Sequence, residues 1–213
     1  MSRAIIFANG LVPDLESARR LIQPGDTLIA VDGGTHHALA MGFMPSVVIG
    51  DLDSLTVEDR QRTMERNVRL LEYPADKNQT DLELALEYGI QQGFREILIV
   101  GALGGRLDQT LGNLSLLSAP RLTAFNIRFD DGVEEVFFVR GRSEVRGQAG
   151  DTVSLIPWGA PVTGVTTNGL RWPLRDETLF PEETRGISNE MLSETASIEI
   201  VSGLLLVVRH RQS

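Results

Sequence analysis

Aspartates recur just past the ends of short apolar runs in the first half of the chain. The runs at 26–31, 46–50, 68–73 and 96–100 are followed by Asp32, Asp51, Asp53, Asp76, Asp81 and Asp108. If the runs are strands of one parallel sheet, their carboxyl ends lie along the edge where ligands bind. Carboxylates gathered there repel one another unless a cation neutralises them, and oxygen donors suit magnesium with a nucleotide phosphate. The pattern therefore predicts a magnesium–nucleotide site.

Each of these aspartates also has a purely structural explanation. An aspartate beside glycine or serine is commonly a turn former or a helix cap. Asp81, as the first residue of a predicted helix, would interact favourably with the helix dipole without binding anything. The shared site is favoured because acidic residues follow four separate strand ends, which turn chemistry alone does not require.

A glycine-rich segment joins the run at 96–100 to the next helical stretch. Its sequence, GALGGR at 101–106, lets the backbone approach a phosphate through Gly104 and Gly105. It matches neither the Walker motif nor the dinucleotide fingerprint, so alone it is weak evidence. Arg106 and Lys77 add cations for phosphate oxygens, and the alternative for each is a surface ion pair with an acidic neighbour.

The sequence pattern changes near residue 122. Before it, predicted strands at 3–8, 26–31, 46–50, 68–73 and 96–100 alternate with segments of helical periodicity, which favours a mainly parallel α/β sheet. The pattern TDLE at 80–83 predicts Thr80 as a helix N-cap. After it, short β-branched and aromatic runs punctuated by glycines favour a β-sandwich. We expect an α/β domain over 1–122 and a β-sandwich over 123–213.

Composition narrows the class of protein. The net charge of −9 and the pI near 4.9 argue against a nucleic-acid partner, which needs many neutralising cations. The chain has no cysteine, so it forms no disulfide. No apolar run approaches the length that spans a bilayer. We expect a cytoplasmic protein that binds neither nucleic acid nor membrane.

The acidic and glycine-rich motifs in their order and spacing resemble the thiamine pyrophosphokinase family. They are GDLDS at 50–54, DKNQTD at 76–81 and GGRLD at 104–108, and the resemblance continues with TNGLRWPL at 167–174 and RGISNE at 185–190. It implies an α/β domain for ATP and magnesium, followed by a β-sandwich that binds thiamine and dimerises. It also implies a homodimer with thiamine sites between its subunits.

The resemblance assigns roles by position. It implies metal-associated Asp51, Asp53 and Asp81; catalytic Asp32, Asp81, Arg106 and Asp108; nucleotide-binding Lys77, Gly104, Gly105, Arg106 and Gln109; and thiamine-binding Trp172, Ser188 and Asn189. Gln109 stands where many bacterial members have histidine, and Trp172 where many have tyrosine, which should preserve stacking. Without the resemblance, an aromatic between charged and proline residues in a β domain would be read as a core or edge plug.

The expected activity is transfer of the diphosphate of ATP to the thiamine hydroxyl, giving thiamine diphosphate and AMP. One rival is a pyrophosphokinase for another heterocyclic alcohol, such as a hydroxymethylpterin. The other is a non-catalytic nucleotide or thiamine sensor. The first differs in acceptor and the second in making no product.

Overall fold

The computed structural model describes residues 3–212, which form two compact units, Met1–Val133 and Glu134–Ser213. The elements of the first unit are β1 (Arg3–Phe7), α1 (Leu15–Arg20), β2 (Thr27–Val31), α2 (Gly34–Ala40), β3 (Val47–Gly50), α3 (Val57–Glu65), β4 (Arg69–Glu72), α4 (Asp81–Gln91), β5 (Glu96–Val100), α5 (Leu107–Leu117), η1 (Pro120–Leu122) and β6 (Asn126–Asp130). The strands predicted from apolar runs are all present within a residue or two of their expected ends.

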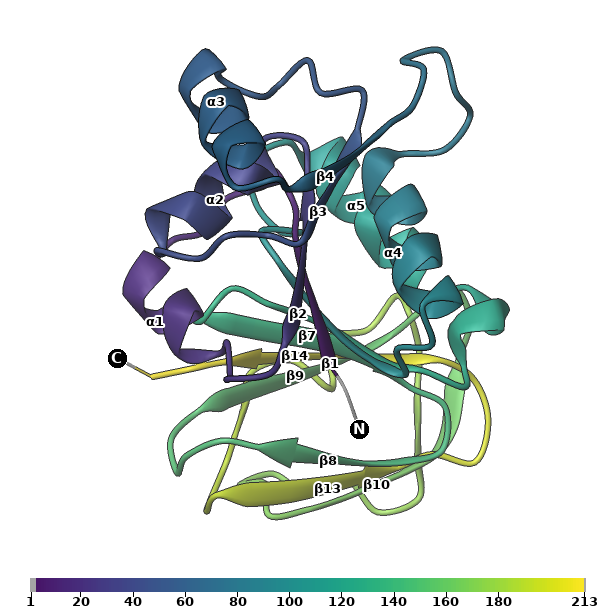
Figure 1. The fold of residues 1–213 in the computed structure, drawn as a ribbon. Coiled ribbons are helices and arrows are strands. Elements are labelled where there is room, and N and C mark those ends of the chain that lie inside the picture. The colour runs from purple at the N-terminus through teal and green to yellow at the C-terminus, as the bar shows by residue number, and fades with distance from the viewer. Residues whose placement is uncertain (1–2, 213) are drawn as a thin grey trace. The chain divides into compact units, whose positions relative to one another are not determined.

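The strands of the first unit form a parallel sheet in the order β6-β5-β1-β2-β3-β4. Helices α1, α2 and α3 lie on one side of this sheet, and α4 and α5 lie on the other (Figure 1). The side changes because the chain runs outward from β1 to β4 and then returns through α4 to β5, beside β1. With right-handed crossovers, this reversal places the two sets of helices on opposite faces. Such a switch point opens a crevice at the carboxyl ends of the strands.

The core of the first unit explains its continuous apolar runs. Strand β1 is covered on both faces, and Ile5 and Phe7 are fully buried against Val48, Leu98 and neighbours from the helices. Strands covered on both faces lose the alternation of apolar and polar residues that half-exposed strands keep. Thr80 caps α4, because its side chain accepts a hydrogen bond from the Glu83 amide at 3.2 Å, as the sequence pattern predicts.

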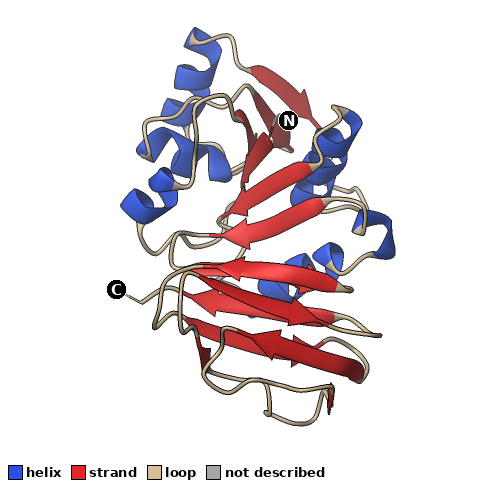
Figure 2. Ribbon diagram, turned by 90° about the horizontal axis from the view of Figure 1, so that it is seen from below, coloured by secondary structure: helices blue, strands red, loops and turns tan. Residues whose placement is uncertain are grey.

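The second unit contains only strands as regular elements over residues 134–212 (Figure 2). They are β7 (Glu134–Val139), β8 (Arg142–Arg146), β9 (Thr152–Pro157), β10 (Val162–Asn168), β11 (Glu177–Leu179), β12 (Asn189–Glu190), β13 (Thr195–Glu199) and β14 (Leu205–His210). Antiparallel pairing gives the orders β12-β9-β14-β7 and β11-β10-β13-β8. One buried cluster joins residues of both sheets, including Val139, Leu155, Val165 and Ile198. This is a β-sandwich, so the predicted fold class is confirmed.

The two units divide between Val133 and Glu134, later than the change of texture near residue 122. The difference is β6, which pairs in parallel with β5 and buries Ile127 and Phe129 in the first unit. A short β-branched run looks the same in a parallel sheet and in a sandwich, so only the pairing partner distinguishes them. No helix over residues 3–212 is long and apolar enough to cross a membrane.

Candidate functional site

A cavity of about 440 Å³ lies in the first unit, among the loops that follow the parallel strands. Its walls come from the segments after β1, β2, β3 and β5 and from the first turns of α4 and α5: Ala8, Asn9, Gly10, Leu11, Val31, Asp32, Asp51, Asp53, Ser54, Thr80, Asp81, Leu82, Gly101, Ala102, Gly104, Gly105, Arg106, Gln109 and Asn113. Strand order explains this gathering, because parallel strands all end at one edge of their sheet.

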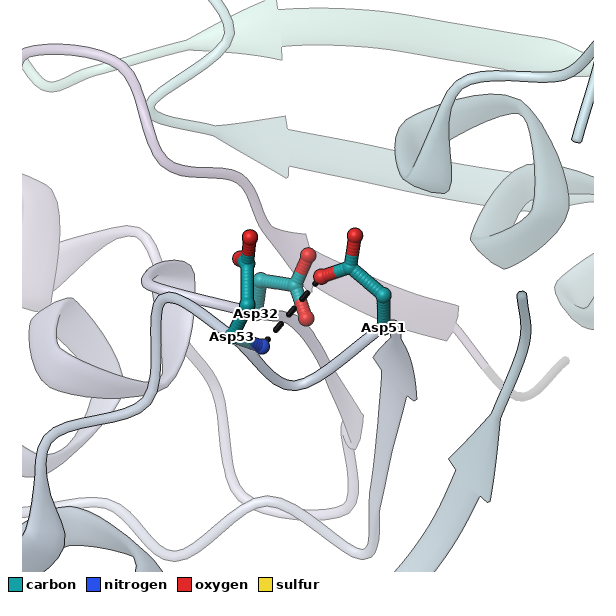
Figure 3. A group of neighbouring side chains, drawn as sticks. All are labelled: Asp32, Asp51 and Asp53. Carbon is teal, nitrogen blue, oxygen red and sulfur yellow. Dashed lines mark hydrogen bonds between the residues drawn. The ribbon is translucent and has the colours of Figure 1, made fainter. Parts of the chain in front are cut away.

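Three aspartates meet in this cavity. Asp32 follows β2, while Asp51 and Asp53 follow β3, and one carboxylate oxygen from each lies within 4.8 Å of the others. Figure 3 shows the three side chains together; the dashed line marks the Asp53 amide, which donates to Asp51 Oδ1 at 3.2 Å. Burial increases from the exposed Asp53 through Asp51 to Asp32, which is only 6% exposed. The site therefore has an open side, from which a charged ligand can enter.

The backbone around Asp32 is shaped to hold its carboxylate. Asp32 and Leu52 both adopt positive φ, at 41° and 63°. The Leu52 amide donates to Asp32 Oδ1 at 2.9 Å. A Cβ on Gly50 would lie 2.1 Å from that same oxygen, so only glycine leaves room for the carboxylate. Positive φ at a residue other than glycine costs free energy that the surrounding structure must supply.

The electrostatics of Asp32 indicate that nearby cations do not compensate the carboxylates of this site. Burial raises the pKa of Asp32 to about 7; the Leu52 hydrogen bond opposes this shift, and the nearby charges of Asp81 and Asp51 add to it. Desolvation and like charges both disfavour the ionised carboxylate. A dication bound among these oxygens would reverse both effects.

Asp81 adds a fourth carboxylate at the start of α4. Its Oδ1 is buried and, among the described residues, accepts no hydrogen bond. Lys77 Nζ lies 2.8 Å from this oxygen as its ion-pair partner. The proximity of Asp81 raises the pKa of Lys77, so the lysine keeps its charge. The Asp81 carboxylate and the three nearby carboxylates offer a set of oxygen donors that fits magnesium.

The glycine-rich loop after β5 also lines the cavity. Gly104 and Gly105 both have a φ of 72°, and α5 begins at Leu107 without a side-chain cap from Arg106. Asp108 in the first turn of this helix takes backbone hydrogen bonds from the Gln109 amide and from its own amide, so a phosphate bound here would compete with the Asp108 carboxylate for them. Gln109 lines the cavity from this helix.

Arg106 and Asp108 form a fork-like ion pair beside this loop. The Arg106 Nε donates to Asp108 Oδ1 at 3.1 Å, and the guanidinium Nη2 meets the second carboxylate oxygen. The hydrogen bond from Arg106 lowers the pKa of Asp108. Arg106 lines the cavity, whereas Asp108 and Lys77 do not; these two predicted residues are ion-paired with the lining residues Arg106 and Asp81.

Trp172, Ser188 and Asn189 belong to the second unit and form a group of their own. The Trp172 side chain is half exposed, and Asn189 is buried beside it. The Asn189 side chain bonds both main-chain polar groups of Trp172. Ser188 has a φ of 59°, and its amide donates to Ser154 Oγ at 3.1 Å.

Asn9, Gly10 and Leu11, which follow β1, line the cavity although the sequence analysis named none of them. The signal was present, because Asn9-Gly10 directly follows the first predicted strand and the rule about strand ends applies there too. His37 in α2 places its Nε2 2.8 Å from the Gly10 carbonyl oxygen. Asn113 also lines the cavity, and its Nδ2 donates to the Ala102 carbonyl at 2.8 Å.

Comparison with known proteins gives consistent results for both units. A family model described as the catalytic domain of thiamin pyrophosphokinase matches residues 18–129, and one described as its vitamin B1 binding domain matches residues 142–205. The thiamine pyrophosphokinase of Bacillus subtilis (strain 168) is 32% identical over 183 residues, covering 85% of this chain and 86% of that protein. Thiamine pyrophosphokinase 1 of Oryza sativa subsp. japonica is 28% identical over 180 residues, covering 80% of this chain and 68% of that protein.

Solved structures agree with the sequence relatives. The crystal structure of thiamine pyrophosphokinase from Bacillus subtilis superposes with a TM-score of 0.88 at 28% identity, covering 100% of both chains. That of thiamin pyrophosphokinase from Geobacillus thermodenitrificans gives 0.84 at 27% identity, covering 100% of this chain and 99% of the other. The converging aspartates, the two matched domains and these neighbours lead to one conclusion: the chain belongs to the thiamin pyrophosphokinase family.

Proposed function

We propose that this chain transfers the diphosphate of ATP to the hydroxyl of thiamine, giving thiamine diphosphate and AMP. The observation that carries the proposal is the meeting of Asp32, Asp51 and Asp53 in one cavity, with the partly buried Asp81 adding to their charge. Such a cluster favours binding of a dication, and magnesium with a triphosphate supplies one. The family membership favours thiamine over a pterin alcohol as the acceptor.

We assign the metal to Asp51, Asp53 and Asp81, with Asp32 behind them. When bound, magnesium would neutralise phosphate oxygens and the carboxylates together. The open loop at Gly104 and Gly105 supports a role in approaching the phosphates. Lys77 holds Asp81 in place, and Gln109 reaches the cavity from the first turn of α5.

In the proposed reaction, the thiamine hydroxyl oxygen attacks the β-phosphorus of ATP. The bond from that phosphorus to the oxygen bridging it to the α-phosphorus breaks, and AMP leaves with this oxygen. Arg106 exchanges its carboxylate partner for phosphate oxygens, since its planar fork suits either. We prefer Asp81 to Asp108 as the acceptor of the hydroxyl proton, because Asp108 is exposed, lies outside the cavity lining and is held ionised by Arg106.

The second unit supplies the proposed thiamine site, with Trp172 stacking on the pyrimidine ring and Ser188 and Asn189 beside it. We further propose a homodimer whose thiamine sites lie between subunits. Exposed apolar side chains support this: Trp172 is 50%, Ile187 44% and Leu192 58% exposed. Sedimentation velocity at several concentrations tests the dimer. Cytoplasmic location stays a prediction from sequence.

Mass spectrometry of the protein incubated with ATP, magnesium and thiamine tests the function. Thiamine diphosphate and AMP should appear in equal amounts, and neither should form when a chelator removes magnesium. A hydroxymethylpterin offered in place of thiamine should give no AMP. Appearance of AMP with the pterin alone would favour the rival acceptor. Binding of ATP and thiamine without any product would favour the sensor.

A further inference from the structure

The side chain of Asn189 acts as a main-chain partner for Trp172. Its Oδ1 accepts from the Trp172 amide at 3.0 Å and from the Glu190 amide at 2.9 Å, and its Nδ2 donates to the Trp172 carbonyl at 2.7 Å. A carboxamide offers the same acceptor and donor as a peptide group. At 7% exposure, Asn189 has these groups turned inward and committed to the loop of Trp172.

This side-chain pairing extends the contact between two segments of the second unit. The Arg171 amide donates to the Glu190 carbonyl at 2.9 Å, and the Leu192 amide donates to the Gly169 carbonyl at 2.9 Å. Pro173 follows Trp172 and has no N–H, so a regular ladder cannot continue past it. The side-chain carboxamide of Asn189 ends the pairing and fixes the main chain of Trp172.

The indole of Trp172 has one face covered by its neighbour. The Arg171 guanidinium carbon lies 5.1 Å from the ring centroid, within the range of a cation–π contact. Glu190 holds the guanidinium in place, because Arg171 Nη1 donates to Glu190 Oε2 at 2.9 Å. The residue as a whole is 50% exposed, and we take the face of the indole away from Arg171 as the open one.

The charge on the covered face decides which ring the open face accepts. An indole attracts cations through its negative π face, and a guanidinium over one face already uses this attraction. A second cation on the opposite face would also be repelled by Arg171. Thiamine carries a neutral aminopyrimidine ring and a cationic thiazolium ring, so the neutral ring is the better partner here.

We propose that Arg171 is a specificity-determining positioning residue, braced by Glu190, which makes the open face of Trp172 select the neutral pyrimidine over the cationic thiazolium. Asn189 contributes by fixing the Trp172 backbone, and it does not contact the ligand itself. The inference rests on the proposed function only in taking thiamine as the ligand of Trp172.

The test follows Trp172 fluorescence in a Trp158→Phe background, without ATP or magnesium. Trp158 is replaced because it is the other tryptophan and packs edge-on against Phe138, with ring centroids 5.4 Å apart. The probes are the isolated aminopyrimidine alcohol and the isolated N-methylated hydroxyethyl thiazolium. Arg171→Gln removes the cation, and Arg171→Lys restores it. Arg146→Gln makes the same charge change at an exposed ion pair with Glu144 in β8.

We expect the protein with Arg171 to bind the pyrimidine more tightly than the thiazolium. Arg171→Gln should reduce this preference about threefold and raise the quenching of Trp172 by acrylamide, with Arg171→Lys lying between. Arg146→Gln should change neither quantity. An unchanged preference and unchanged acrylamide quenching in Arg171→Gln would overturn the proposal.

Steady-state kinetics separate this inference from the proposed function. Asn189→Ala should raise KM for thiamine about tenfold, because the Trp172 loop loses two hydrogen bonds, while KM for ATP stays within about twofold. Asn189→Asp keeps the acceptor and loses the donor, so its KM should be intermediate. Equal effects on both KM values would reject the positioning role. If the unmodified protein made no thiamine diphosphate, the function would fail, yet acrylamide quenching would still decide whether Arg171 covers Trp172.

Discussion

At the scale of single residues, Asp32 shows how the fold can hold an ionisable side chain in a buried position. Its positive φ, the glycine at position 50 and the Leu52 amide together hold a carboxylate that burial disfavours. A proton is one way to stabilise this group, and a dication is another. In the ligand-free protein, burial and nearby negative charges thus disfavour the ionised form of Asp32, and a bound metal would relieve this.

Replacement of the exposed carboxylate tests the metal assignment. Asp53→Asn should keep the fold, because Asp53 is exposed and its main-chain N–H, not its side chain, donates the hydrogen bond to Asp51 Oδ1. The oxygen of an asparagine side chain can still accept the hydrogen bond that Ser54 Oγ donates to Asp53 Oδ1. Turnover should fall by about 100-fold, since a metal ligand is lost from a charge-stabilising site. Asp176→Asn, in the second unit at a φ of 57° that asparagine tolerates, is the matched control and should stay active. Full turnover in Asp53→Asn would refute the assignment.

The raised pKa of Asp32 predicts opposite pH dependences for stability and for metal binding. Between the ordinary value of 3.8 and about 7, the folded protein holds a proton that the unfolded chain has lost. The free energy of unfolding of the metal-free protein should therefore fall as pH rises through this interval, and level off above it.

Magnesium must displace that proton, so its affinity should rise over the same interval. Urea unfolding and magnesium titration at about pH 5 and about pH 8 measure the two trends. Asp32→Asn should flatten both of them. Metal affinity that is independent of pH in the unmodified protein would contradict the predicted proton release.

At the scale of elements, helix caps separate stability from function. Thr80 caps α4 through the Glu83 amide at 3.2 Å, and Thr56 caps α3 through the Asp59 amide at 3.0 Å. Either change to alanine should lower the free energy of unfolding by about 0.5–2 kcal/mol. Only Thr80→Ala should also weaken magnesium binding, because Thr80 lines the cavity and Asp81 is the first residue of α4. Equal metal affinity in both variants would show that the Thr80 cap does not contribute to magnesium binding.

At the scale of the whole molecule, ligand binding should stabilise the chain by mass action. ATP with magnesium at about 100 times its dissociation constant should add about 2.7 kcal/mol to the free energy of unfolding. Thermal unfolding with and without a chelator measures this, and the chelator should remove most of the effect. Asp53→Asn should show little stabilisation by the same mixture. Stabilisation by ATP that survives the chelator would show that the nucleotide does not need the carboxylate cluster.

The sequence by itself determined which elements form and which strand ends are acidic. Continuous apolar runs such as 96–100 read as buried strands, the TDLE pattern predicted the cap at Thr80, and short β-branched runs predicted the sandwich. These features are local, because propensity, capping and burial pattern act within a few residues. The gathering of Asp32, Asp51 and Asp53 followed from the rule for parallel strand ends.

Only the tertiary structure decided features that depend on partners distant in the chain. The assignment of β6 to the parallel sheet required its pairing with β5, and the lining by Asn113 from within α5 required the packing of that helix. The same holds for the burial of Asp32, which raises its pKa, and for the hydrogen bonds between Asn189 and Trp172. Burial and hydrogen-bond partners are properties of three-dimensional neighbourhoods, and spacing along the chain does not specify them.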